Sequence, residues 1–471
     1  MNLDDFRKWA HKAVDWSADY LGALRDRPVR AQTAPGDIIN TIAEAPPGTA
    51  EPFEDIFGDV DKLIMPGITH WQHPRFFAYF PANSSPPSVV AEILTAAIGA
   101  QCMLWQTSPA ATELEIRVMD WLRQMIGLPE GFKGVIQDSA SSATLCAILT
   151  GREKALDFRG NTQGLAGNPA TRVYCSDQVH SSIDKAVWVA GVGQENLVKV
   201  PTTAPDYALD PVALEAAIEA DLAAGHLPAT IVACIGATGV GASDSIGPVA
   251  EVARKYGLHL HVDAAWAGSA MICPEYRYLM EGSEQADSFV FNPHKWMAVN
   301  FDCSAYFVRD SEALVRTLAI RPAYLKTQGQ DEIVNFSEWS VPLGRRFRAL
   351  KLWFVIRAYG VEGLQAMLRN HIAWTAELAG EIDAHPDFEL VTRPVLSLFS
   401  FRYAPAGAGD LDGLNARLLA TINDDGRIYL TPTVHDGKSV IRFTVGQTAV
   451  TEADVRFAWD VIREIADQIP A

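Results

Sequence analysis

Lys295 is the first of several residues whose type and position in the sequence could support catalysis. Lys295 follows the apolar stretch Phe289–Phe291 and the pair Asn292-Pro293. Proline ends regular strand pairing, so the spacing predicts that Lys295 lies in a loop at a strand exit. Burial among apolar neighbours disfavours the charged form of an amine and makes it nucleophilic, as a Schiff base requires. A lone lysine of this kind more often covers apolar surface with its alkyl chain. The other candidate residues must therefore decide between packing and a Schiff base.

A carboxylate and an imidazole follow other short apolar segments. Asp263 ends the segment Leu258–Asp263 and is followed by alanines, and a carboxylate buried there needs a cation. His180 comes after the segment Thr171–Cys175 among small polar residues. Its ring could stack on a ligand or shuttle a proton, although a single histidine is more often structural.

Two loops of small residues complete the set. Ser139-Ala140-Ser141 precedes a helical segment, and N–H groups at a helix N-terminus can bind phosphate, although serine-rich caps alone are common. The loop Gly236–Asp244 lacks the Gly-Lys-Ser/Thr ending of a P-loop. A phosphate cradle, a flat ring, a carboxylate and an amine, in this order along the chain, are what pyridoxal 5′-phosphate requires.

The composition of the 471 residues is that of a globular protein, with 48% hydrophobic and 20% charged residues. The net charge of −18 argues against a nucleic-acid partner, which favours a basic surface. No apolar run reaches the roughly 18 residues of a membrane span, and the acidic start is unlike a signal peptide. The six cysteines are scattered without a CxxC pair, which indicates a reducing compartment. We expect a cytoplasmic protein without a metal site.

Apolar and helical segments alternate through the middle of the chain. This pattern predicts an α/β fold in which a mostly parallel sheet is flanked by helices. The expected strands are 134–137, 171–175, 231–235, 258–263, 288–292 and 304–308. The expected helices include 111–126, 212–224, 247–256, 349–359 and 362–382. Ligands of such sheets bind beyond the carboxyl ends of the strands, where the candidate residues fall.

The N-terminal part has two apolar features. Residues 4 to about 24 show helical spacing with an apolar face that must dock on the main body or on another chain. Farther on, Trp71, Tyr79 and Phe80 belong to a stretch too rich in aromatic residues for a solvated loop. From its residues alone, this stretch could equally form the core of an interface or the lining of a pocket.

The C-terminal part reads as a smaller α+β unit. Antiparallel strands are expected at 388–391, 396–403, 428–431 and 439–444. His435-Asp436-Gly437 forms the expected turn between the last two, and Thr451 with Asp454 caps the closing helix. We therefore divide the chain into an N-terminal helical and dimerisation segment (1–84), a large cofactor-binding domain (85–349) and a small C-terminal domain (350–471).

These motifs resemble those of group II pyridoxal-phosphate decarboxylases, and within that group those of aromatic-L-amino-acid decarboxylases. The resemblance rests on the cofactor segments 139–141, 261–265 and 292–295, and on Thr69–Pro74, Tyr79–Pro81 and Pro342–Arg348. It implies the fold-type I architecture and a homodimer with the active site at the subunit interface. It also implies an N-terminal helical flap exchanged between the subunits.

The resemblance implies a role for individual residues. Lys295 would form the Schiff base, Asp263 would pair with the ring nitrogen, and His180 would stack on the ring. The other residues expected to contact the cofactor are Ser139, Ala140, Ser141, Thr238, Ala265, Ser288, Asn292 and His294, with Gly344 approaching from the partner subunit. The residues expected to shape an aromatic substrate pocket are Trp71, Tyr79, Phe80, Pro81, Ala82, Met103 and Trp105. Of the two alternatives for the aromatic stretch, the resemblance therefore favours the lining of a pocket.

Two positions depart from the family's pattern. The mobile catalytic loop of the family carries a tyrosine that returns a proton to the substrate carbon, whereas this chain has Phe336 in a shorter loop. Where animal relatives contact a catechol with threonine, this chain has Ala82. The pocket is therefore expected to depend less on ring hydroxyls.

The expected activity is decarboxylation of an aromatic L-amino acid, such as Phe, Tyr, Trp or 3,4-dihydroxyphenylalanine, to the amine and CO₂. The alternative is an aromatic acetaldehyde synthase, in which oxygen-dependent decarboxylation is coupled to deamination, because Phe336 cannot donate a proton. A third class is a homologue that binds the cofactor without catalysis. The retention of His180, Thr238, Asp263 and Lys295 argues against it.

Overall fold

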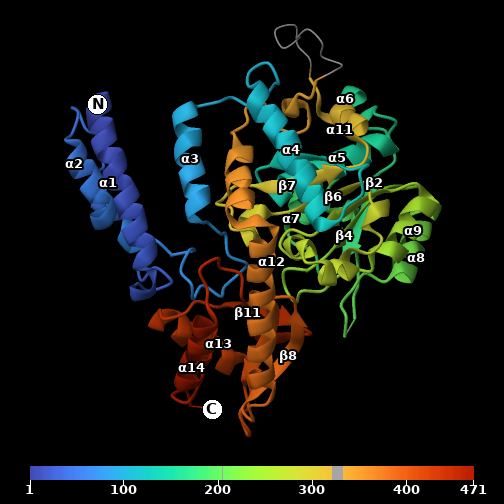
Figure 1. Ribbon diagram of the computed structural model, residues 1–471. Coiled ribbons are helices and arrows are strands. Elements are labelled where there is room, and N and C mark those ends of the chain that lie inside the picture. The colour runs from blue at the N-terminus through green and yellow to red at the C-terminus, as the bar shows by residue number, and fades with distance from the viewer. Residues whose placement is uncertain (204, 321–332, 471) are drawn as a thin grey trace. The chain divides into compact units, whose positions relative to one another are not determined.

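The structure, a computed structural model, describes residues 1–203, 205–320 and 333–470 (Figure 1). The chain separates into two compact units, one formed by residues 83–372 and the other by residues 1–82 with 373–471. The N-terminal and C-terminal segments expected to be separate thus belong to one unit. The large unit extends beyond the expected boundary at residue 349 to residue 372, which lies inside helix α12 (Arg348–Asp383), a helix with a kink at Gly360.

A seven-stranded sheet forms the centre of the large unit, with the strand order β1-β7-β6-β5-β4-β2-β3. The strands are β1 (Lys133–Gln137), β2 (Thr171–Ser176), β3 (Leu197–Val200), β4 (Leu227–Cys234), β5 (His259–Asp263), β6 (Ser288–Phe291) and β7 (Ser304–Val308). Strand β7 runs antiparallel to both neighbours, and the remaining pairings are parallel. The predicted mostly parallel sheet is confirmed.

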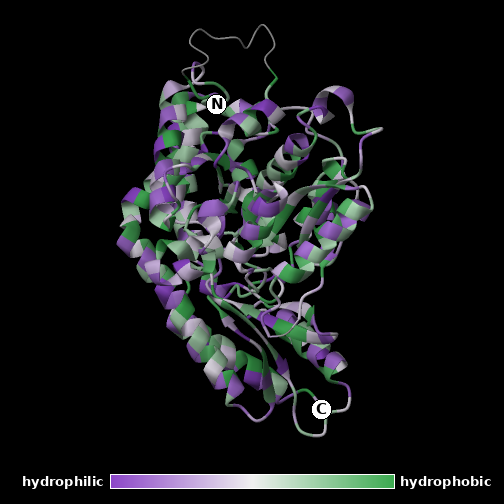
Figure 2. Cartoon of the chain, turned by 90° about the vertical axis from the view of Figure 1, so that its right-hand side faces the viewer, coloured by the Kyte–Doolittle hydropathy of each residue, from purple (hydrophilic) through white to green (hydrophobic). Residues whose placement is uncertain are grey.

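Helices flank this sheet, as the alternating pattern predicted. The helices of the large unit are α3 (Pro86–Ile98), α4 (Pro109–Ile126), α5 (Ala140–Ala155), α6 (Gly160–Gln163), α7 (Ser182–Val189), α8 (Pro211–Ala223), α9 (Ile246–Tyr256), α10 (Pro293–Trp296), α11 (Ser311–Leu318) and the first part of α12. Among them, α4, α5, α8, α9 and α10 pack against strands of the sheet. Most of them carry hydrophilic and hydrophobic residues together (Figure 2), as helices do when one face lies on the core. Helix α5 is buried along much of its length and packs against β4 and β5.

The smaller unit contains a four-stranded antiparallel sheet with the order β10-β11-β9-β8. Its strands are β8 (Phe388–Val395), β9 (Leu398–Tyr403), β10 (Thr431–His435) and β11 (Lys438–Thr444), and its helices are α1 (Leu3–Gly22), α2 (Phe53–Asp59), α13 (Leu411–Asp425), α14 (Glu452–Ala466) and the end of α12. The pairing of His435 with Lys438 leaves Asp436-Gly437 as a two-residue turn. Both have positive φ, as a type I′ turn requires.

Two strand predictions differ from the structure. The segment 428–431 is wrong as a strand, since Ile428 and Leu430 are fully buried but β10 begins only at Thr431. Strand β3 (Leu197–Val200) was not predicted; it is a short edge strand that is only partly buried. The predicted caps on the last helix are confirmed, since Thr451 and Asp454 form a reciprocal capping box. In the described part of the chain, no helix is both long and apolar enough to cross a membrane.

Candidate active site

A cavity of about 250 Å³ lies at the carboxyl ends of the central strands of the large unit. Its walls include every residue expected to contact the cofactor except Ser288 and Gly344. The lining residues are Ser139, Ala140, Ser141, His180, Ser182, Cys234, Gly236, Thr238, Asp263, Ala265, Trp266, Asn292, His294 and Lys295. Segments up to 156 positions apart in sequence thus converge on one site, because parallel strands direct their ends to the same edge of the sheet.

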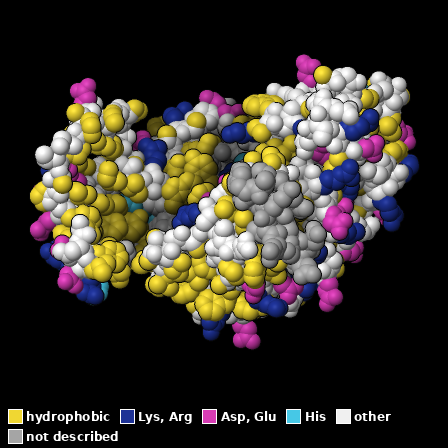
Figure 3. All heavy atoms as spheres, turned by 90° about the horizontal axis from the view of Figure 1, so that it is seen from above, with side chains coloured by type: hydrophobic (Ala, Val, Ile, Leu, Met, Phe, Trp, Pro, Cys, Tyr) yellow, Lys and Arg dark blue, Asp and Glu magenta, His cyan; other side chains and the backbone are white. Residues whose placement is uncertain are grey.

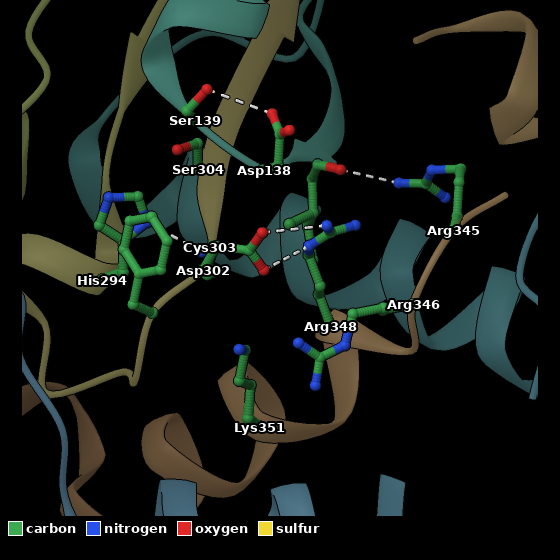
Figure 4. A network of polar contacts seen from close by, with 12 residues as sticks. Asp138, Ser139, His294, Asp302, Cys303, Ser304, Arg345, Arg346, Arg348 and Lys351 are labelled. Atoms are coloured by element: carbon green, nitrogen blue, oxygen red, sulfur yellow. Dashed lines mark hydrogen bonds and ion pairs between the residues drawn. The ribbon is translucent and has the colours of Figure 1, made fainter. Parts of the chain in front are cut away.

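The start of helix α5 forms one end of the cavity. Ser139 is its N-cap, and the hydroxyl of Ser139 accepts a hydrogen bond from the N–H of Ser142 at 3.2 Å. The same hydroxyl donates to a carboxylate oxygen of Asp138 at 3.2 Å (Figure 4). The helix is 16 residues long, and its N-terminus carries partial positive charge with N–H groups directed outward. This end of the cavity suits a phosphate group.

Asn292 and His294 are each fixed by groups outside the cavity. The side-chain carbonyl of Asn292 accepts from the hydroxyl of Ser304 at 2.6 Å, so the amide NH₂ is turned away from Ser304. The N–H of Cys303 donates to Nδ1 of His294 at 2.9 Å (Figure 4). Since Nδ1 accepts, a neutral His294 carries its proton on Nε2. Burial lowers the pKa of His294 to about 3, so the ring is neutral.

Asp263 supplies a buried carboxylate at the end of β5. Its side chain is 6% exposed, and Oδ1 accepts from the N–H of Ala265 at 3.0 Å. Burial raises its pKa, and the positive charge of Lys295 opposes that effect. A buried carboxylate of this kind is stabilised by a cationic partner such as a protonated ring nitrogen.

His180 lies at the rim of the cavity, where part of its ring is open to solvent. The hydroxyl of Ser182 lies 2.9 Å from Nδ1 of the ring. Loss of hydration lowers the pKa of His180, and the nearby charge of Lys295 lowers it further. The ring is therefore uncharged at neutral pH and flat, which suits stacking on an aromatic ligand.

Lys295 lies in α10, a helix of a single turn between β6 and β7. Its side chain is half-buried in the wall of the cavity. The expected strand-exit position is thus found, with Asp263 at the end of the neighbouring strand β5. Amine, carboxylate, imidazole and helix N-terminus surround one space.

The phosphate contact expected of Ser288 is wrong. Ser288 is the first residue of β6, at the opposite end of the strand from Asn292, and it is fully buried. Its hydroxyl lies 2.9 Å from Nδ1 of His261 and 3.3 Å from Nε2 of His259. Gly344 is exposed, with the Gln101 amide 3.2 Å from where a Cβ would lie, and its contact across subunits stays a prediction.

The expected substrate residues fall in both units. Trp71, Tyr79, Phe80, Pro81 and Ala82 belong to the smaller unit, where Trp71 and Tyr79 stack at 5.6 Å and are each partly exposed. Met103 and Trp105 belong to the large unit and do not line the cavity. The carbonyl of Met103 accepts from the N–H of Ser337, and the N–H of Trp105 donates to Asn335 at 3.1 Å.

Phe336 is described, although residues 321–332 before it lie outside the described part. Its side chain is 1% exposed and packs in a buried cluster with Val135 and Trp339. Phe336 does not itself line the cavity, although Ala140 of the same cluster does. The Trp339 ring meets it edge-on at 5.8 Å, and the guanidinium of Arg345 lies 4.9 Å from its ring centre. In this conformation Phe336 is a core residue.

Four cavity residues were not predicted from sequence: Ser182, Cys234, Gly236 and Trp266. Each stands close to a predicted residue, so proximity along a strand exit could have identified them. Gly236 has a φ of +78°, and a Cβ there would lie 2.8 Å from the Trp266 ring. The Trp266 indole N–H in turn donates to the Gly236 carbonyl at 2.6 Å.

The donor set fits pyridoxal phosphate. A helix N-terminus is placed for the phosphate, a buried carboxylate for the ring nitrogen, a neutral imidazole for the ring face and an amine for the aldehyde carbon. The family model of the pyridoxal-dependent decarboxylase conserved domain matches residues 35–404. The chain belongs to this family of pyridoxal-dependent decarboxylases.

Individual relatives agree with the family match. The aromatic-L-amino-acid decarboxylase of Sus scrofa is 43% identical to this decarboxylase, over 100% of this chain and 98% of the relative. A phenylacetaldehyde synthase of Arabidopsis thaliana is 39% identical, over 100% of this chain and 97% of the relative. The crystal structure of Oryza sativa TDC with PLP and tryptamine superposes with a TM-score of 0.96 at 37% identity, over 99% of each chain.

Proposed function

We propose that this chain decarboxylates an aromatic L-amino acid to the corresponding amine and CO₂, with pyridoxal phosphate as its cofactor. The observation that carries this proposal is the convergence of Lys295, Asp263 and His180 on one cavity beside the N-terminus of α5. When bound, the cofactor withdraws electrons from the substrate's Cα through its protonated ring nitrogen. Full-length relatives that are named aromatic-L-amino-acid and tryptophan decarboxylases support the substrate class.

The residues of the chain would divide the work as follows. Lys295 binds the cofactor covalently through its amine, and Asp263 holds the proton on the ring nitrogen by placing a buried negative charge beside it. The N–H groups at the start of α5 and the amide of Asn292 bind the phosphate. His180 stacks on the ring, and its neutral form has an N–H with which it can hold a proton near the reacting carbon.

We also propose that the chain works as a homodimer in the cytoplasm. Apolar side chains are exposed on α3 of the large unit, namely Val90, Ile93, Leu94 and Ile98, each at least 42% exposed. Hydrophobic side chains gather in patches on the face drawn in Figure 3, between polar and charged side chains. Apolar surface of this extent on a folded chain is typical of a subunit interface. The six cysteines are free thiols and are buried, which supports a reducing compartment.

A second candidate is the oxygen-dependent formation of an aldehyde. The amino acid, O₂ and H₂O would give the aldehyde, CO₂, NH₃ and H₂O₂, so that the substrate is oxidised by two electrons and O₂ is reduced by two. Two observations favour it. Phe336 cannot donate a proton, and relatives 39% and 34% identical are named phenylacetaldehyde and 4-hydroxyphenylacetaldehyde synthases.

One product analysis tests both candidates. The purified holoenzyme is incubated in air with Phe, Tyr, Trp or 3,4-dihydroxyphenylalanine, and CO₂, amine, aldehyde and peroxide are measured. Amine equal to CO₂ supports decarboxylation, whereas aldehyde and peroxide equal to CO₂ support the second candidate. CO₂ from none of these substrates would refute the proposal.

A further inference from the structure

The helix that carries Lys295 is too short to hold itself in place. Helix α10 contains only Pro293–Trp296. A single turn fixes several backbone dihedrals for very few hydrogen bonds, so it is not stable on its own. The last carbonyls of any helix also lack partners within the helix. The carbonyls of His294 and Lys295 therefore need donors from elsewhere in the fold.

Asn83 supplies donors to both of these carbonyls. It precedes α3 and lies 212 positions before Lys295, and it is 2% exposed. Its backbone N–H donates to the carbonyl of His294 at 2.8 Å. Its side-chain NH₂ donates to the carbonyl of Lys295. Two consecutive peptide groups of the lysine turn are thus held by one residue.

The contact continues along the chain beyond Asn83. The hydroxyl of Ser85 donates to the carbonyl of Ala298 at 2.6 Å, and both residues are buried. The hydroxyl of Ser88 accepts from the N–H of Asn300 at 2.8 Å and donates to its side-chain carbonyl. Residues 83–88 therefore follow residues 294–300 side by side, and Asn83 is the member of this segment that contacts Lys295.

We infer that Asn83 is a positioning residue for Lys295, and this inference rests on the proposed role of Lys295 in binding the cofactor. Orienting the peptide group after Lys295 fixes the direction of its Cα–Cβ bond. The amine stands at the end of a long flexible side chain, so a small rotation of the main chain moves it far from the position needed for attack. Asn83 keeps the amine within reach of the cofactor's aldehyde carbon.

Covalent attachment of the cofactor tests this inference without reference to decarboxylation. Cofactor-free Asn83→Ala, which loses the side-chain amide and keeps the backbone N–H, is mixed with pyridoxal phosphate. Attachment is followed by absorbance, and borohydride reduction with peptide mass spectrometry locates the modified lysine. We expect attachment to slow by roughly tenfold, the effect of about one lost hydrogen bond.

Ser88→Ala is the matched control, since Ser88 is a fully buried hydrogen-bonding residue of the same segment that contacts Asn300 and not the lysine turn. Both variants are first compared with wild type by thermal unfolding without cofactor. Asn83→Asp provides a second variant of the same size that keeps the backbone donor and loses the side-chain donor. The inference holds if Asn83→Ala and Asn83→Asp slow attachment more than Ser88→Ala at similar melting temperatures.

Two outcomes would overturn it, and they are distinguishable. The positioning role of Asn83 is refuted if all variants attach the cofactor at the wild-type rate, or if Ser88→Ala slows attachment as much as the Asn83 variants do. The proposed function would then still stand. Modification of a lysine other than Lys295 in wild type would remove the proposed role of Lys295 and this inference with it.

Discussion

The backbone N–H of Ser182 donates to Nδ1 of His180 at 3.1 Å. An N–H group can only donate, so Nδ1 must be the acceptor, and the neutral ring carries its proton on Nε2. The tautomer of the histidine at the rim of the cavity is thus set by the first turn of α7. His180 can therefore donate a hydrogen bond from Nε2 without being charged.

The first prediction concerns the attachment lysine. Lys295→Ala should abolish covalent attachment, because the amine is the group that reacts with the aldehyde of the cofactor. Borohydride reduction followed by intact mass measurement reports the attachment directly. Lys154→Ala, a half-exposed lysine on α5, is the control and should retain one cofactor per chain. A reducible cofactor adduct in Lys295→Ala would refute the assignment.

The second prediction concerns the N-terminal helix. Helix α1 exposes Phe6 (54%) and Val14 (50%), while Trp9 packs on Phe53 and Phe57 of α2. Deletion of residues 1–30 should cause aggregation or loss of cofactor, because the apolar surface that α1 covers becomes exposed. Light scattering after size exclusion gives the mass of the particle, and absorbance gives its cofactor content. An active, well-behaved monomer would contradict the proposed homodimer.

The third prediction concerns substrate choice. Ala82 offers no hydrogen bond to a ring hydroxyl, and an apolar pocket discriminates weakly between substrates with and without one. We expect kcat/KM for phenylalanine and for 3,4-dihydroxyphenylalanine to differ by less than about 10⁴-fold, the discrimination typical of a site that binds a hydroxyl. Ala82→Thr should shift the ratio toward the catechol. A wild-type preference above that limit would contradict this reading.

The fourth prediction concerns Phe336. A positioned proton donor typically contributes about 10²–10⁴-fold to a proton transfer, and phenylalanine supplies none. The wild type should therefore give some aldehyde, ammonia and peroxide beside the amine in air. Phe336 lies in the buried cluster with Val135 and Trp339, so Phe336→Tyr should raise the share of amine only if residue 336 leaves that cluster during the reaction. The same assays under nitrogen are the control, since aldehyde formation needs O₂. Amine alone from the wild type, with no change in the variant, would contradict this prediction.

The fifth prediction concerns acid stability. Burial lowers the pKa of His371 to about 3, far below its value of about 6.5 in an unfolded chain. The unfolded state therefore binds more protons between these values, so the stability that His371 contributes is complete above pH 6.5 and is lost as the pH falls toward 3. His371→Gln, which can still accept from the Trp296 indole, removes this titration. Urea unfolding between pH 7 and 5 gives the free energy of unfolding at each pH. For His371→Gln this free energy should change less with pH than for the wild type, by up to about 1.4 kcal/mol per pH unit. An unchanged slope would contradict it.

The sequence predicted the elements that have strong periodicity and the residues at strand ends. Lys295, Asp263, His180 and the loop at Ser139 converge as expected, because a strand exit is recognisable from an apolar run that ends in a proline or a small residue. The strand at 428–431 was misplaced because burial and strand pairing produce the same apolar pattern. Strand β3 was missed because it is short and only partly buried.

Two contacts could not be found in this way. Ser288 is close to Asn292 in sequence, but four residues along a strand span roughly 13 Å, so the two side chains lie at opposite ends of β6. The bond from Asn83 to the Lys295 carbonyl joins residues 212 positions apart through a backbone acceptor, which every residue type possesses. No feature of sequence spacing identifies such a contact.

The position of α5 also affects how the protein must be handled in the laboratory. Its N-terminus faces the same cavity as the amine of Lys295, so this corner favours any small oxyanion. Inorganic phosphate or sulfate in a buffer would compete with the phosphate group of the cofactor. The affinity for pyridoxal phosphate measured in phosphate buffer should therefore be weaker than the affinity measured in an organic amine buffer. Only the second value reports how strongly the site itself binds the cofactor.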